Sequence, residues 1–599
     1  MRKLLLGAAI FLAATVAASP VSFAAPQDTH AAQDGPLQAK VQEKAQPQHP
    51  DEPLVRAKHG MAVSAQHLAT QVGVEILKQG GNAVDAAVAV GYALAVTFPE
   101  AGNLGGGGFM TVRFHDGRTA FIDFRETAPA AATATMYLDA NGNPVAERSR
   151  RGYLAAGVPG TVAGLELARV KYGSRPRAAL MADAIRLARD GFVLDQGDAD
   201  MLAEAADEFR KDGPSAAIFL NKGQPWKPGQ RLIQADLARS LSQIAKGGPD
   251  AFYKGPIAAR MVAASKAGGG IFAMRDFASY RARELKPLEC DYRGYRMISA
   301  PPPSSGGVVL CETFNILEGY PIGELGFHSS AGTHLLTEAM RRAYHDRNLN
   351  LGDPSFVTID TNHFIDKAYA ASLRQGIDPN RATPSASLPA PGIGGEGNST
   401  THFSIVDKDG NAVSLTYTLN DWFGAHVTAA GTGILLNDEM DDFSAKPGSP
   451  NMYGLVEGPN NAIAPGKRPL SSMTPTIVTR DGKLVMVVGT PGGSRIPSAV
   501  IETISNVVDF GMTVTDAVNA PRVHHQWLPD EIGYEQFGLS ADTIARLQAM
   551  GHKVVPMDYG NQVAAILVGA PAIGGKPLGE QRLYGAIDPR LNVGDVEGY

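Results

Sequence analysis

The chain has 599 residues, of which 44% are hydrophobic and 19% are charged, and its formal net charge is -6. This composition is typical of a soluble globular protein with a large core. The mildly acidic balance argues against nucleic acid as a partner.

The first 24 residues, 1–24, have the pattern of a secretory signal peptide. A basic Arg2-Lys3 pair precedes an apolar run over 4–16, and Ser22-Phe23-Ala24 resembles a cleavage site. Because the apolar run is short for a membrane span and no comparable run follows, we expect export rather than a retained membrane anchor. Residues 25–52 are rich in Gln, Ala and Pro and are expected to form a flexible segment outside the fold.

Two helices and a strand are predicted next along the chain. Apolar residues recur on one face of residues 66–79, which predicts an amphipathic helix ending before Gly80. Asn82 can cap a second helix over 83–96, whose Ala and Val content indicates burial on most sides. A strand is expected over 119–124.

The glycine-rich run 102–108 could suggest a phosphate-binding loop. No Lys follows it, and its spacing matches neither common nucleotide fingerprint. We therefore expect these glycines to allow close packing of the backbone.

A β-hairpin is predicted where a Pro- and Gly-rich loop, 384–397, meets an alternating segment that begins at Thr400. Asp409-Gly410 provides a tight turn, and a second alternating run follows over 412–419. If the hairpin closes around that dipeptide, Thr401 faces Thr418 and Thr400 faces Leu419. The Thr418 hydroxyl is then one residue from Thr400.

Thr400 could become an N-terminal nucleophile. Cleavage of the Ser399-Thr400 bond would free an α-amine with an ordinary pKa of about 7.7 to 8, which could take the proton of the hydroxyl on the same residue. One residue would then supply both nucleophile and base. The alternative is that Thr400-Thr401 merely opens a strand, in which Thr is common.

The C-terminal part continues the mixture of strands and helices. Strands are expected over 483–488 and 562–568, and helices over 498–509 and 541–550, which favours a layered α+β body.

Few residues suggest a metal site. The two cysteines, Cys290 and Cys311, can form a disulfide after export or remain buried thiols, and their number excludes a Cys-based zinc site. His402 and the pair His524-His525 lack a carboxylate at ligand spacing, so we interpret them as structural and expect no metal.

A series of short motifs occurs in the order seen in one enzyme family. They are Gly80-Gly81-Asn82-Ala83-Val84-Asp85-Ala86-Ala87, Gly105-Gly106-Gly107-Gly108-Phe109-Met110, Arg125-Glu126-Thr127-Ala128-Pro129, Pro301-Pro302-Pro303-Ser304-Ser305-Gly306-Gly307, Thr400-Thr401-His402, Met440-Asp441-Asp442-Phe443-Ser444, Lys467-Arg468-Pro469-Leu470-Ser471-Ser472-Met473 and Thr490-Pro491-Gly492-Gly493-Ser494. From about Pro53 to Tyr599 the chain resembles bacterial γ-glutamyltransferases of the N-terminal-nucleophile hydrolase superfamily.

The resemblance implies a four-layer αββα sandwich and a periplasmic proenzyme that cuts itself before Thr400. A large chain, 53–399, and a small chain, 400–599, would then form one heterodimeric body. No cofactor is implied. The expected substrates are glutathione and other γ-glutamyl compounds, with water, amino acids or dipeptides as acceptors.

The resemblance also assigns roles around Thr400 and Thr418. Arg125 and the serines Ser471 and Ser472 would bind the substrate α-carboxylate, since a guanidinium can hold a carboxylate through two charge-assisted bonds.

Other positions are expected to complete the site. Asp442, assisted by Asn420 and Glu439, would bind the α-ammonium. The N–H groups of Gly492 and Gly493 would stabilise an oxyanion. Tyr453 matches a lid-loop aromatic, and Trp422 departs from the small polar residues of better-known relatives and is expected to line the leaving-group side.

Two other functions stay open at this point. A related acylase would remove glutaryl or similar side chains from β-lactam nuclei, although the retained Asp442 argues against it. A periplasmic glutathione-binding protein without catalysis would remain a single chain.

Overall fold

Two antiparallel seven-stranded sheets form the centre of the fold. The computed structural model describes residues 54–388, 400–577, 579, 582–591 and 593–599, so the predicted signal peptide, the segment 25–52 and Ser399 lie outside the described residues. The first sheet has the order β1 (Val55–Ala57), β20 (Leu583–Ile587), β19 (Ala564–Val568), β15 (Lys483–Gly489), β14 (Thr476–Arg480), β9 (Tyr295–Ser299), β8 (Leu288–Tyr292). The second has the order β21 (Asp595–Gly598), β2 (Met61–Ser64), β10 (Thr401–Val406), β11 (Ala412–Thr418), β3 (Gly107–Arg113), β4 (Thr119–Asp123), β7 (Arg283–Leu285).

The two sheets face each other across a dry apolar layer. Buried side chains from both sheets meet there, including Val63, Val406, Ile477, Val487 and Ile566. Central strands therefore have no face towards water. This explains why every residue of β10 and β11 is buried, although the alternating sequence pattern alone would also fit a half-exposed hairpin.

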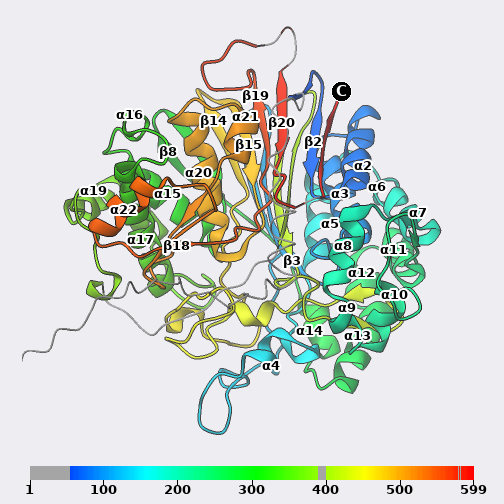
Figure 1. Cartoon of the computed structure of the whole chain (residues 1–599). Helices are drawn as coiled ribbons and strands as arrows, with labels where there is room; N and C mark the ends of the chain where they lie inside the picture. The colour runs from blue at the N-terminus through cyan, green and yellow to red at the C-terminus, as the bar shows by residue number, and fades with distance from the viewer. Residues whose placement is uncertain (1–53, 389–399, 578, 580–581, 592) are drawn as a thin grey trace, which may run out of the picture. The chain divides into compact units, whose positions relative to one another are not determined.

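Helices cover the outer face of each sheet (Figure 1). The second sheet packs against α2 (His67–Lys78), α3 (Ala83–Thr97) and α5 (Thr161–Tyr172), and further helices, including α7 (Ala182–Asp190), α11 (Ala235–Gly247) and α13 (Pro256–Ala267), belong to the same apolar cluster. The first packs against α15 (Gly306–Leu317), α17 (Ser330–Asn350), α20 (Ile496–Val508) and α21 (Val514–Asn519). The predicted four-layer αββα arrangement is confirmed.

The helix ends follow the capping signals in the sequence. Gln66 accepts hydrogen bonds from the backbone of Leu68 and Ala69 at the start of α2. Asn82 and Asp85 form a capping box at the start of α3, which is buried along its whole length as predicted. Later predicted elements are also present with shifted ends, as β15, β19, α20 and α22 (Ala541–Ala549).

The predicted hairpin exists, but its predicted register was wrong by one residue. Thr401 pairs with Tyr417, and the last pair is Val406 with Ala412. The turn is a five-residue loop, because the Asp407 side chain accepts from the backbone N–H groups of Asp409 and Asn411 and centres the turn on Asp409. A two-residue turn at Asp409-Gly410 would have moved every pair.

The glycine run provides close backbone packing, as predicted. A Cβ at Gly106 would overlap the Thr418 carbonyl oxygen, and a Cβ at Gly108 would overlap the Thr416 carbonyl oxygen. These glycines let β3 lie directly against β11, the strand that ends at Thr418.

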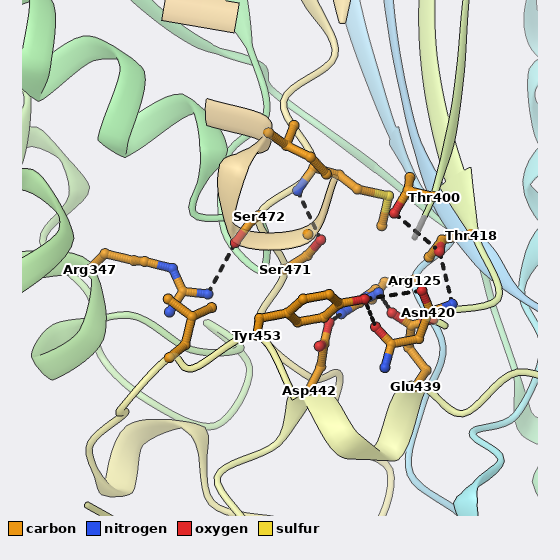
Figure 2. Close-up of a pocket in the computed structure, with 14 residues that line it drawn as sticks. Arg125, Arg347, Thr400, Thr418, Asn420, Glu439, Asp442, Tyr453, Ser471 and Ser472 are labelled. Atoms are coloured by element: carbon orange, nitrogen blue, oxygen red, sulfur yellow. Dashed lines mark hydrogen bonds and ion pairs between the residues drawn. The ribbon is translucent and has the colours of Figure 1, made fainter. Parts of the chain in front are cut away.

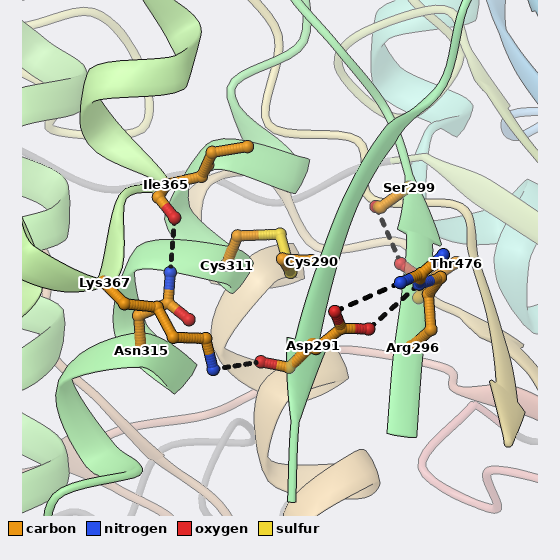
Figure 3. Close-up of a disulfide and its surroundings, with 9 residues drawn as sticks. All are labelled: Cys290, Asp291, Arg296, Ser299, Cys311, Asn315, Ile365, Lys367 and Thr476. Carbon is orange, nitrogen blue, oxygen red and sulfur yellow. Dashed lines mark hydrogen bonds and ion pairs between the residues drawn. A yellow bond between two sulfur atoms is a disulfide. The ribbon is translucent and has the colours of Figure 1, made fainter. Parts of the chain in front are cut away.

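The two cysteines form a disulfide (Figure 3). Cys290 lies on β8 and Cys311 on α15, with their Cα atoms 5.8 Å apart. The bond joins the edge of the first sheet to the helix that covers it. Of the two possibilities left open by the sequence, the structure has the disulfide.

None of the helices in the described part of the chain has the length and apolar character needed to span a bilayer.

Candidate active site

Thr400 lies at one end of a pocket with an empty volume of about 290 Å³ (Figure 2). The pocket collects residues from segments that are far apart in the sequence. Its lining consists of Arg125, Arg347, Thr400, Thr418, Asn420, Glu439, Asp442, Tyr453, Leu455, Ser471, Ser472, Met473, Gly493 and Ile496. Ten of the sequence-predicted site residues are therefore brought together here.

Hydroxyl groups occupy the Thr400 end. The Thr400 hydroxyl donates to Thr418 Oγ1 at 3.2 Å, and Thr418 Oγ1 also accepts from the Asn420 backbone N–H at 2.8 Å. Thr400 directly precedes β10, and Thr418 ends the paired strand β11. In the true register, which pairs Thr401 with Tyr417, Thr418 lies directly opposite Thr400, so the two hydroxyls meet across the hairpin.

Charged groups occupy the other end. Arg125 follows β4 and is fully buried. Its guanidinium donates to Glu439 and to Asp442, and to the backbone oxygens of Pro469 and Leu470 at 3.2 Å each. The predicted anion-binding and cation-binding groups are thus paired with each other in this pocket.

Negative charge exceeds positive charge around Arg125. A third buried carboxylate, Glu126, has an oxygen 3.7 Å from Arg125 Nη1. Burial raises the pKa of Glu439 well above its ordinary value and also raises that of Asp442, despite the opposing effect of Arg125. Burial likewise raises the pKa of Glu126 to about 8. The guanidinium of Arg125 therefore only partly offsets the cost of burying the three carboxylates.

A glycine turn and a tyrosine contribute to the pocket: Gly493 and Tyr453 line it, whereas Gly492 precedes Gly493 without lining it. Gly492 and Gly493 both have positive φ, 129° and 56°, which favours glycine at these positions. A Cβ at Gly493 would overlap the Tyr453 ring. The Tyr453 hydroxyl donates to the Asn420 backbone oxygen at 3.0 Å and to Asn420 Oδ1 at 2.7 Å, so the ring lies over the glycine turn.

The serine pair lies near a residue that sequence reasoning missed. Ser471 Oγ accepts from the Met473 backbone N–H at 3.1 Å, and Ser472 Oγ accepts from Arg347 Nη2 at 3.3 Å. Arg347 lies on α17 and is buried. No local signal could have found it, since charged residues on a predicted helix usually indicate a solvated face.

Some residues singled out in the sequence lie elsewhere. Trp422 is not among the residues that line this pocket and packs against the apolar cluster under the second sheet, so its place on the leaving-group side stays a prediction. His402 is buried between Thr416 and Ser404, and burial lowers its pKa to about 3, which keeps the ring neutral.

His524 and His525 are also buried and hydrogen-bonded, His524 to Ser498 and Gln526 and His525 to Asp530.

One group in the described part of the chain has ligand atoms close enough for a metal, namely His334, Glu338 and His552. Its donor atoms are already engaged. His334 binds His552 at 2.7 Å and the Asp378 backbone oxygen at 2.8 Å, while Glu338 accepts from two arginines on α17.

Comparison with known proteins places the chain in a family. A family model described as gamma-glutamyltranspeptidase matches residues 69–596. The chain belongs to the γ-glutamyltranspeptidase family. The fold is accordingly the αββα sandwich of the N-terminal-nucleophile hydrolase type.

Individual relatives cover almost the whole family region. The glutathione hydrolase proenzyme of Pseudomonas sp. (strain A14) is 60% identical over 547 residues, which are 91% of this chain and 95% of that protein. The glutathione hydrolase proenzyme of Escherichia coli (strain K12) is 51% identical over 547 residues, covering 91% and 93%. Among solved structures, a cephalosporin acylase from Bacillus halodurans is similar with a TM-score of 0.78 at 28% identity, covering 93% of this chain and 99% of that one.

Proposed function

We propose that this chain is a self-processing γ-glutamyltransferase and glutathione hydrolase. Family membership and the high identity to glutathione hydrolase proenzymes support this activity. The observation that carries it to particular residues is a pocket that contains a threonine hydroxyl at one end and a buried Arg–Asp pair at the other.

The Arg–Asp pair is complementary to an amino-acid zwitterion. A γ-glutamyl group has an α-carboxylate and an α-ammonium on one carbon, so the carboxylate can take Arg125 while the ammonium takes Asp442. The substrate carboxylate would replace Asp442 as the partner of Arg125, and the substrate ammonium would replace Arg125 as the partner of Asp442. Each buried protein charge would therefore keep a partner of opposite sign. Glu439 and Asn420 lie beside Asp442 and complete the ammonium site, while Ser471 and Ser472 donate to the carboxylate.

The first chemical step is self-cleavage. The Thr400 hydroxyl attacks the Ser399 carbonyl, the bond to the Thr400 nitrogen breaks, and water hydrolyses the resulting ester. The products are a large chain that ends at Ser399, whose folded part is 53–399, and a small chain, 400–599. The freed α-amine of Thr400 then serves as the base.

Turnover uses the same hydroxyl. Thr400 Oγ1 attacks the γ-glutamyl amide while its proton passes to the α-amine, and the Gly492 and Gly493 N–H groups hold the oxyanion. The amine leaves with that proton, and for glutathione it is cysteinylglycine. Water or the amine of an amino acid or dipeptide then takes the glutamyl group from the ester, which gives ping-pong kinetics.

Export places this reaction in the periplasm. The proposal rests on the signal-peptide pattern of residues 1–24, and segment 25–52 would connect that signal to the folded body. Tyr453, on a loop that packs over the glycine turn, would form part of a movable cover over the bound γ-glutamyl group.

A direct test runs purified wild-type protein on a denaturing gel and measures its hydrolysis of γ-glutamyl-p-nitroanilide. We expect two bands and release of p-nitroaniline. A single band with no turnover would instead support the glutathione-binding protein.

A second candidate is a glutaryl or cephalosporin acylase, which the similarity to the cephalosporin acylase favours. A glutaryl group lacks the ammonium, so its binding would take Arg125 from Asp442 and leave that carboxylate without a partner. We therefore expect preference for γ-glutamyl over glutaryl anilide, and the reverse preference would favour the acylase.

A further inference from the structure

Arg347 is linked to the Ser471–Ser472 segment directly at Ser472 and indirectly, through Ser305, at Ser471. Its Nη2 donates to Ser472 Oγ at 3.3 Å, and its Nε donates to Ser305 Oγ at 3.0 Å. Ser305 Oγ in turn donates to the Ser471 backbone oxygen at 2.7 Å. The same guanidinium is therefore linked to the side chain of one serine and to the main chain of the other, and Figure 2 draws it beside Ser472.

The Pro301–Gly307 motif holds the Ser471–Ser472 segment through backbone hydrogen bonds. The Ser305 N–H donates to the Ser471 oxygen at 2.7 Å, and the Ser471 N–H donates to the Pro303 oxygen at 2.9 Å. Ser304 Oγ also donates to the Met473 oxygen at 2.5 Å. The motif thus runs alongside the serine pair and carries Ser305 to Arg347.

Arg347 is not available as a second binding site for a substrate anion. Its Nη1 donates to Glu457 Oε1 at 2.5 Å and to Asn348 Oδ1 at 2.7 Å. Both Arg347 and Glu457 are buried, so the pair is locally neutral. Arg347 itself lines the pocket, and its hydrogen-bond partner among the other lining residues is Ser472.

An arginine side chain can only donate hydrogen bonds. Ser472 Oγ must therefore accept from Arg347, and its single proton remains to be donated elsewhere. Among the described residues, no protein acceptor takes that proton.

We propose that Arg347 is a positioning residue that orients the Ser472 hydroxyl to donate to the substrate α-carboxylate and fixes the Ser471 main chain through Ser305. This inference rests on the proposed function and adds a residue that does not touch the reacting atoms.

The test is Arg347→Lys, which keeps the charge opposite Glu457 but loses the planar fork that reaches Ser305 and Ser472 together. For γ-glutamyl-p-nitroanilide we expect KM to rise about tenfold, the effect of weakening one hydrogen bond to a charged group, while kcat stays within about threefold. For 4-aminobutanoyl-p-nitroanilide, which lacks the α-carboxylate, kcat/KM should not change.

The serine supplies a second readout. In a Ser472→Ala background, Arg347→Lys should raise KM by less than it does in the wild type, because the route through the Ser472 hydroxyl is already lost and only the route through Ser305 remains. Arg341→Lys is the matched control: Arg341 lies on the same helix, is equally buried and binds Glu338 and Asp530, yet does not line the pocket. It should leave KM unchanged.

Equal losses on both anilides, or additive effects of Arg347→Lys and Ser472→Ala, would overturn the inference. If Arg347→Lys fails to fold, Ser305→Ala provides the test, with a smaller rise in KM for the same substrate. Loss of folded, processed protein in both variants would also count against a role confined to positioning. Absence of wild-type cleavage of γ-glutamyl-p-nitroanilide would reject the proposed function itself, so the two failures are distinguishable.

Discussion

The two ends of the pocket present different kinds of groups. Around Thr400 there are neutral hydroxyls and glycine backbone. Thr418 Oγ1 accepts a hydrogen bond from the Thr400 hydroxyl at 3.2 Å. Around Arg125 there are three buried carboxylates and one guanidinium. Bond making needs an unhindered nucleophile and N–H donors, whereas recognition of a zwitterion needs paired, desolvated charges. The comparison implies that changes at the Thr400 end alter rate and changes at the Arg125 end alter selectivity.

The largest effect is expected at the nucleophile. Thr400→Ala should abolish self-cleavage and lower turnover by at least about 10⁴-fold, since loss of a covalent nucleophile leaves only binding and oxyanion stabilisation. Thr400→Ser should still cut itself slowly, because the hydroxyl remains but the methyl that restricts its rotamer is lost. A denaturing gel and an anilide assay measure both. Two bands from the alanine variant would show that another residue performs the cleavage.

Gly492 tests the oxyanion assignment at the same end. A Cβ there would overlap the Asn561 side chain, and φ is 129°, so Gly492→Ala should displace the turn. We expect kcat to fall by a factor equivalent to about 2.7 to 4 kcal/mol if one donor is lost, with a smaller change in KM. Gly466→Ala controls for the positive φ alone, because a Cβ at Gly466 has open space. Comparable losses of kcat in the two variants would contradict a specific role for Gly492.

Asp442 tests the charged end. In Asp442→Asn the bound ammonium loses its counter-charge, a penalty of about 2 to 5 kcal/mol by analogy with other desolvated pairs, while a glutaryl group no longer meets an unpaired carboxylate. Activity on γ-glutamyl-p-nitroanilide should fall sharply, glutaryl anilide cleavage should become detectable, and processing should be retained. If the ratio of the two activities stays at the wild-type value, Glu439 becomes the next candidate for the ammonium partner.

The smallest effect concerns Glu126 and pH. Burial raises its pKa in the folded state to about 8, above the ordinary value of 4.5 in the unfolded chain. The neutral form therefore contributes stability that is fully present below about 4.5 and is lost as pH rises through about 8. Denaturant unfolding of Glu126→Gln should lose less stability between pH 5 and pH 9 than the wild type. Parallel pH curves for the two proteins would mean that Glu126 is already ionised at low pH.

Local features of the fold could be predicted from the sequence. The end of α2 before Gly80, the Asn82 cap of α3 and the close-packed glycines are local signals, and each was correct. The hairpin register was predicted wrongly, because it depends on the Asp407 side chain, which accepts hydrogen bonds from two backbone N–H groups of the turn. Nor could alternation show that β10 is covered on both faces, because that depends on the first sheet, which packs against it, and on the helices of the outer layer.

Some residues of the candidate site could likewise be predicted from the sequence, and others could not. Thr400, Arg125 and the serine pair belong to motifs with local patterns, and the fold brings them to one pocket. Arg347 comes from a helix without such a pattern, and its role depends on a hydrogen-bond chain through Ser305. The mutual pairing of Arg125 with Glu439 and Asp442 was likewise beyond sequence reasoning, which assigned these groups to different parts of a ligand.

The central claim is that Thr400 becomes the N-terminal nucleophile by cleavage of its own peptide bond. The most direct measurement is the intact mass and N-terminal sequence of the chains in purified, active wild-type protein. The account predicts a small chain that begins with Thr400 and ends at Tyr599. A fully active protein in which residues 399 and 400 remain joined would contradict it.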